Sequence, residues 1–89
     1  MYSVVYSNKA LREFQKLDKP TAVMIFGWID KNLVNCSNPR LHGEALIGDK
    51  KGYWRYRIGT YRLIADIHDD IVAIEIINVA HRRDIYNNR

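Results

Sequence analysis

Aromatic and aliphatic residues alternate with arginines over residues 53–64, and this period of two predicts a pair of strands. Gly59 and Thr60 between the two runs have the composition of a two-residue hairpin turn. With that turn, Arg57 lies opposite Arg62, and side-chain alternation places both on the same face as Arg55. The other face then carries the apolar set Trp54, Tyr56, Ile58, Tyr61 and Leu63.

Two helices are predicted between residues 8 and 34, after a short β-branched strand over residues 2–6. Ser7 and Asn8 can cap the first helix, and Pro20 suits the first turn of the second. Gly27, inside the second helix, is expected to allow close packing against the first. The apolar positions are Ala10, Leu11, Phe14 and Leu17 in the first helix, and Val23, Phe26, Ile29 and Leu33 in the second, widened by Ile25 and Trp28.

Residues 35–52 have the composition of a loop, and strands are expected near residues 53–58, 60–67 and 71–79. Asp69 and Asp70 form the expected turn between the last two strands. The prediction is an α+β fold in the order β-α-α-β-β-β, with a three-stranded antiparallel meander and both helices on one sheet face. The opposite, open face holds Arg55, Arg57, Arg62, Asp66, Glu75 and Ile77. Strand parity adds His81 to the arginine face unless the chain bends at Ala80.

Length and composition narrow the class of protein. Eighty-nine residues predict one domain, 1–89, and a net charge of +4 favours polyanionic partners only weakly. The single cysteine, Cys36, excludes an internal disulfide and gives no basis for a metal site. The first residues lack the pattern of a signal peptide, and no apolar run reaches membrane-spanning length. We therefore expect a cytoplasmic protein with no membrane partner, no metal and no cofactor.

The arginine face suits a phosphodiester, because a guanidinium binds phosphate through two hydrogen bonds and stays charged. Arginine is a poor general base, and RNA cleavage also needs groups that move protons. His81 and Glu44 are the candidates for that work, and Tyr53 is a candidate for stacking on a base. The tail residues Arg82, Arg83 and Tyr86 add two cations and a phenol beside the arginines.

Simpler interpretations compete with each of these assignments. Arg55 and Arg57 could form a solvated strand face that is salt-bridged to Glu75 and Asp66. His81 could be an ordinary surface histidine. Trp54, Tyr56 and Tyr61 are assigned to the core, while His42 and His68 belong to no evident constellation and are interpreted as surface residues.

Three segments together resemble the RelE/ParE toxin superfamily, and most closely its RelE branch. They are residues 41–46, with the letters LHGEAL, residues 52–64, with W-R-Y-R-x-G-x-Y-R, and residues 78–86, with H-R-R-D-x-Y. The resemblance covers essentially the whole chain, and its element order and size agree as well.

The resemblance implies the toxin of a toxin–antitoxin pair, which enters the A site of the 30S ribosomal subunit and cuts translated mRNA by attack of the 2′-OH. It implies a cognate antitoxin as partner, and contact with operator DNA only through the toxin–antitoxin complex. Phosphate and transition-state ligands carry over to Arg62 and Arg82, and RNA positioning to Arg55 and Arg57. Tyr86 matches a further site position, and Glu44 and His81 remain alternative bases.

Two alternatives to this ribosome-dependent endoribonuclease stay open. One is a ParE-like inhibitor of DNA gyrase, which acts by binding and has no nuclease chemistry. The other is a non-toxic module that keeps the fold and binds nucleic acid or an antitoxin. The sequence leaves codon preference, antitoxin identity and the stoichiometry of the complex undetermined.

Overall fold

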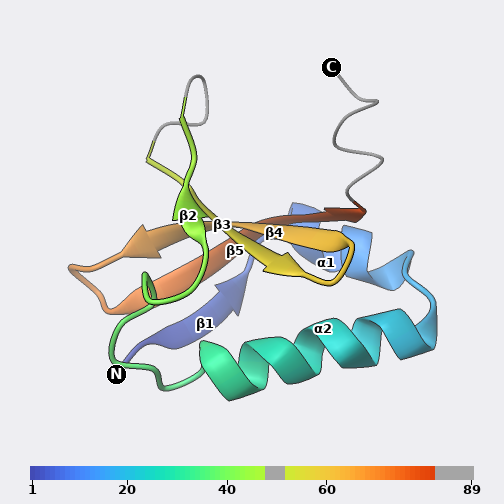
Figure 1. Ribbon diagram of the computed structural model, residues 1–89, viewed down its shortest axis with the longest axis horizontal. Helices are drawn as coiled ribbons and strands as arrows, with labels where there is room; N and C mark the ends of the chain where they lie inside the picture. The colour runs from blue at the N-terminus through green and yellow to red at the C-terminus, as the bar shows by residue number, and fades with distance from the viewer. Residues whose placement is uncertain (48–51, 82–89) are drawn as a thin grey trace.

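The computed structural model describes residues 1–47 and 52–81, and its centre is a five-stranded sheet in the order β1-β5-β4-β3-β2 (Figure 1). The strands are β1 (Ser3–Tyr6), β2 (Glu44–Ala45), β3 (Trp54–Ile58), β4 (Tyr61–His68) and β5 (Ala73–His81). β1 runs parallel to β5, whereas the other neighbours are antiparallel. The predicted α+β order is confirmed, with the short strand β2 as an addition at the sheet edge.

The two helices are α1 (Asn8–Gln15) and α2 (Lys19–Asn32), and each begins at a side-chain cap. The Ser7 hydroxyl accepts from the backbone N–H of Ala10 at 3.0 Å, and the Asp18 carboxylate accepts from that of Thr21 at 3.3 Å. α2 lies along one face of the sheet, and α1 follows β1 (Figure 1). These caps satisfy N–H groups that have no partner within the helix.

The core lies between the two helices and the sheet, and α1 contributes Ala10 and Phe14 to it. α2 buries Ile25, Ile29 and Leu33, whereas Val23, which the apolar pattern placed in the stripe, is 62% exposed. The space around Gly27 is open to a Cβ atom, so the expected close packing at this glycine is wrong. The sheet contributes fully or almost fully buried side chains, namely Tyr56, Ile58, Leu63, Ala65, Ile74, Ile76 and Val79.

The register of the β3–β4 hairpin is as predicted. Arg57 pairs with Arg62, Tyr56 with Leu63, and Ile58 with Tyr61 around Gly59, which has a φ of 59°. Two-residue turns with positive φ match the right-handed twist of the flanking strands, which is why such a short turn fixes the register. Trp54 and Tyr61 are partly buried against the core, as expected.

The register of β4 and β5 differs from the prediction. The turn extends to Val72, so that His68 pairs with Ala73, and a bulge then separates the pairs Ala65–Ile76 and Ile64–Asn78. Ile77 is the extra residue of that bulge, and one extra residue reverses which face the following side chains occupy. After the bulge, the residues of β5 therefore lie on the face opposite to the one that simple alternation predicts. Val79 and His81, for example, share the face of Leu63 and Tyr61.

α1 supports the end of β5 that β1 does not reach. The Glu13 carboxylate accepts from the backbone N–H of Val79 at 2.9 Å and from the side-chain amide of Asn78 at 2.7 Å. A carboxylate thus satisfies an edge N–H that would otherwise need a further strand. Within residues 1–47 and 52–81, neither helix has the length and apolar character needed to cross a membrane.

Candidate functional site

The three arginines of the hairpin share the open face of the sheet, as the register requires. Their exposure differs strongly: the side chain of Arg57 is 61% exposed and that of Arg55 21%, while Arg62 retains 6% of its surface. Arg57 is therefore the most accessible of the three guanidinium groups. Arg62 sets its charge directly opposite Arg57 but offers little surface to a ligand.

A carboxylate lies between two of these arginines. Glu44 on β2 pairs in register with Arg55 on β3, and its Oε2 atom forms an ion pair with Nη2 of Arg55. The same oxygen is 3.6 Å from Nη2 of Arg57. Asp66 and Glu75, the carboxylates expected as alternative partners of Arg55 and Arg57, both contact His68.

Gly43 explains why Glu44 reaches the arginines. Its φ is +80°, and a Cβ atom there would overlap the carbonyl oxygen of Arg55 and lie 2.8 Å from Nε1 of Trp54. The loop can pass this close to β3 only at a residue without a side chain. The Trp54 indole donates to the carbonyl of His42 at 2.6 Å, which fixes the loop one residue earlier.

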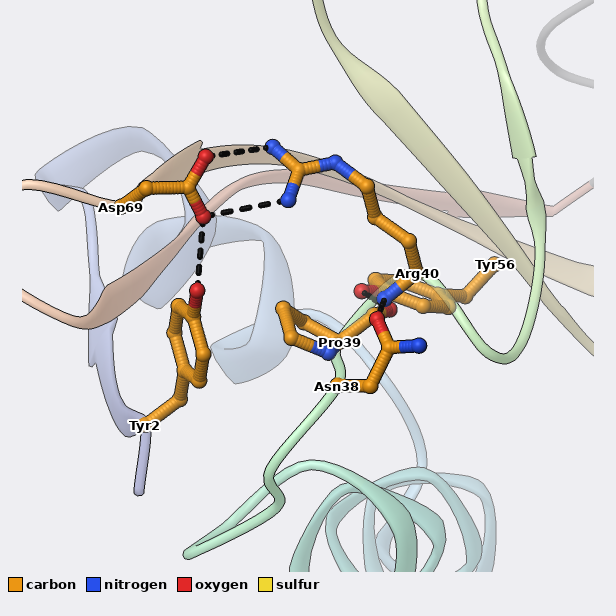
Figure 2. Close-up of polar contacts among 6 residues, drawn as sticks. All are labelled: Tyr2, Asn38, Pro39, Arg40, Tyr56 and Asp69. Atoms are coloured by element: carbon orange, nitrogen blue, oxygen red, sulfur yellow. Dashed lines mark hydrogen bonds and ion pairs between the residues drawn. The ribbon is translucent and has the colours of Figure 1, made fainter.

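The first part of the same loop is tied to the far end of the sheet (Figure 2). The guanidinium of Arg40 donates to both carboxylate oxygens of Asp69, at 3.1 and 3.0 Å, and the Tyr2 hydroxyl donates to Asp69 at 2.6 Å. Arg40 is the main cause that holds the pKa of Asp69 below its usual value. The buried Tyr56 hydroxyl donates to the carbonyl of Pro39 at 2.6 Å (Figure 2). Both ends of the loop before Glu44 are thus anchored.

A shallow depression of about 500 Å³ opens beside Glu44. Trp28 and His42 both line it, although no sequence pattern placed them with the arginines, and their rings meet edge to face at 5.8 Å. The only available indication was that His42 precedes Gly43 and Glu44 in the chain. The complete lining is Trp28, Leu41, His42, Gly43, Glu44, Arg55 and Arg57.

His81 lies away from the arginine face, contrary to the parity prediction. The bulge at Ile77 pairs His81 with Tyr61, and their rings meet edge to face at 5.0 Å. Both residues line a second depression, of about 440 Å³, together with Glu13, Lys16 and other residues near the end of α1. A proton acceptor at His81 would therefore be on the other side of the sheet from Glu44.

Tyr53 is the one remaining predicted site residue that lies among the described residues. Tyr53 is half-buried directly before β3, and its carbonyl accepts from the backbone N–H of Leu46 at 3.0 Å. Arg82, Arg83 and Tyr86 lie outside the described residues. The open sheet face near β2 and β3 thus combines guanidinium groups, one carboxylate and, at its margin, two aromatic rings. That set can bind a phosphate, stack on a base and accept a proton.

A protein-family model matches residues 4–86 of this chain, and its description is "ParE toxin of type II toxin-antitoxin system, parDE". The match covers nearly the whole sequence. It includes the helices, the sheet and the loop that carries Glu44.

Curated relatives and solved structures agree with this match. A RelE-like toxin protein of Escherichia coli is 32% identical over 97% of this chain and 90% of its own length. Toxin RelG of Mycobacterium tuberculosis is 33% identical over 96% of this chain and 95% of its own. In the crystal structure of the toxin–antitoxin complex RelBE2 from M. tuberculosis, one chain superposes with a TM-score of 0.83 at 28% identity, with 91% of each chain covered.

Proposed function

Since the chain belongs to the ParE toxin family of type II toxin–antitoxin systems and is a RelE-like toxin, we propose that it is a ribosome-dependent endoribonuclease. Its substrate is mRNA in the ribosomal A site, and cleavage stops translation. Its cognate antitoxin holds it inactive, and operator DNA is reached only through that complex.

The observation that carries this proposal is the placement of Glu44 between Arg55 and Arg57 on the open sheet face. A nuclease needs cations for the phosphate and a separate group for the proton, because arginine does not give up its own. This face supplies both within one strand pair. The carboxylate weakens the attraction of this face for phosphate, and it is the group here that can accept a proton.

In the proposed reaction, the Glu44 carboxylate takes the proton of the 2′-OH, and the 2′-oxygen attacks the neighbouring phosphorus. The bond from phosphorus to the 5′-oxygen breaks, so that a cyclic phosphate and a 5′-hydroxyl are formed. The leaving oxygen takes a proton from a general acid or from water. Arg57 and Arg55 hold the phosphate and stabilise the negative charge that develops on it. The positive charge of Arg62, which is buried beside Arg57, adds to this electrostatic stabilisation. The position of His81 on the other side of the sheet favours Glu44 as the base.

Induced expression of the chain tests the proposal. We expect growth arrest, and primer extension on cellular transcripts should show cuts within translated codons and none in untranslated regions. Arg57→Ala should remove the cuts while the protein still folds and binds its antitoxin. Arg12→Ala is the matched control, because Arg12 is an exposed cation on α1. Cuts that persist undiminished in Arg57→Ala would contradict the proposal.

The family model gives a specific reason to test a second function, because it describes a ParE toxin. A ParE-like toxin inhibits DNA gyrase by binding. Arrested cells would then show a DNA-damage response and intact mRNA. Growth that is unaffected by expression would favour the third possibility, a non-toxic binding module.

A further inference from the structure

We propose that Asp66, His68 and Glu75 form a binding site for one divalent transition-metal ion of the zinc type. The three side chains lie on β4 and β5, at the end of the open face away from the arginines. The site has no part in the proposed cleavage reaction, and its test does not depend on that reaction.

The His68 nitrogen lies close to the separation that a shared metal requires from each of the two carboxylates. Nε2 of His68 is 3.5 Å from Oδ2 of Asp66 and 3.2 Å from Oε1 of Glu75, and all three donors lie within 4.8 Å of one another. In a tetrahedral zinc site with bonds of about 2.0–2.1 Å, neighbouring donors are about 3.3–3.4 Å apart. An ion could thus bind with small side-chain adjustments only.

The two carboxylates of this cluster also favour the binding of a cation. Asp66 pairs directly with Glu75 across the two strands, and like charges in that arrangement destabilise a sheet. The two carboxylates and Asp70 raise the pKa of the His68 imidazole, and the hydrogen bond to Glu75 is the largest cause. The imidazole therefore lies in a negative potential, which favours the binding of a cation.

The ligand types indicate which ion fits. One imidazole and two carboxylates suit zinc and its neighbours in the first transition row, whereas magnesium and calcium prefer oxygen alone. All three side chains are about one third exposed, so water can complete the coordination.

A bound ion would change the charge of the open face. Asp66 is four residues from Arg62 on β4, or about 13 Å along the strand. The acidic pair gives this end of the face a charge of opposite sign to the arginine end. A divalent ion would neutralise the pair and extend the surface available to a polyanion.

Cobalt(II) titration of the tag-free protein, after treatment with a chelator, tests the site. We expect a visible absorption band that saturates at one equivalent, and loss of at least tenfold in affinity for both His68→Gln and Glu75→Gln. His42→Gln is the matched control and should bind as the unaltered chain does. Far-UV circular dichroism establishes that each variant is folded.

Three results would overturn the proposal. These are the absence of any band, an equal loss of affinity in His42→Gln, and a sulfur-to-cobalt charge-transfer band, which would assign binding to Cys36. Because neutral imidazole is the ligand form, binding should also weaken as the pH falls from 8 to 6. Affinity that is unchanged over this range would likewise contradict a site that contains His68.

Discussion

Arg57 and Arg62 lie directly opposite each other across β3 and β4, so the central hairpin holds two like charges in register. Like charges in that arrangement weaken a sheet, and the Glu44 carboxylate sets a negative charge beside Arg55 and Arg57. An anionic ligand on this face would further reduce the repulsion between the opposed arginines. The same pair of arginines is therefore unfavourable for the stability of the sheet and favourable for the binding of an anion.

The variant Arg57→Ala should change sheet stability and RNA binding in different directions. Removing one of the opposed charges should leave the free energy of unfolding unchanged or raise it by up to about 1 kcal/mol. RNA binding should weaken, and the log–log salt slope should become shallower by about 0.7 for the lost phosphate contact. Urea unfolding and fluorescence anisotropy with a single-stranded oligonucleotide measure the two effects. Arg12→Ala should change neither, and an unaltered salt slope in Arg57→Ala would exclude Arg57 from the RNA surface.

Glu44→Gln tests the proton transfer. The amide keeps the shape of the side chain but cannot act as a base, so cleavage in a translating extract should fall by about 10²- to 10⁴-fold. RNA binding should hold or increase, because a negative charge leaves the surface. Asp30→Asn, an exposed carboxylate on α2, is the control. A larger loss in His81→Gln than in Glu44→Gln would assign the base to His81 instead.

Gly43→Ala and Gly27→Ala should have opposite effects on stability. At Gly43, φ is positive and a Cβ atom would meet the backbone of Arg55, so we expect a loss of at least about 2 kcal/mol from backbone strain and displacement of the loop. At Gly27, inside α2, a Cβ atom meets open space, and alanine should add about 0.5–1 kcal/mol. Urea unfolding of both variants provides the comparison. Equal stability of the Gly43→Ala protein would show that the loop can take another path.

Stability should fall as the pH rises from about 6 to 8, in the presence of a chelator. The folded state raises the pKa of His68 above its usual value of 6.5, mainly through the hydrogen bond to Glu75. The resulting stabilisation is complete below the unfolded pKa and is lost as the pH rises through the folded one. Melting temperatures over this range should show the fall. The His68→Gln protein should lack this contribution, whereas His42→Gln should retain it.

The features that short sequence patterns predicted correctly are those that depend on neighbouring residues alone. The β3–β4 register followed from Gly59 and a period of two, and it placed Arg55, Arg57 and Arg62 correctly on one face. The start of the first helix followed from the capping residue Ser7 and that of the second from Pro20 in its first turn, whereas the Asp18 cap was not predicted. The fold class and the separation of aromatics from arginines therefore needed no tertiary information.

The errors arose where the backbone departs from a regular pattern. Val72 has a φ of 53°, which a β-branched residue rarely adopts, so no local pattern indicated that the β4–β5 turn extends to it. The bulge at Ile77 has no glycine to mark it, and it moved His81 to the face of Tyr61. The contact of Glu44 with Arg55 depends on a short edge strand that only the folded loop creates.

The parallel pairing of β1 with β5 has a consequence for synthesis of the toxin. Tyr6 leaves the ribosome before its partner Ile76, which follows 70 positions later. At about 5–20 residues per second, this delay lasts roughly 4 to 14 s. The sheet cannot be completed until β5 has been synthesised. Synthesis that stops before β5 therefore yields no finished toxin, but only chains in which β1 lacks its neighbour.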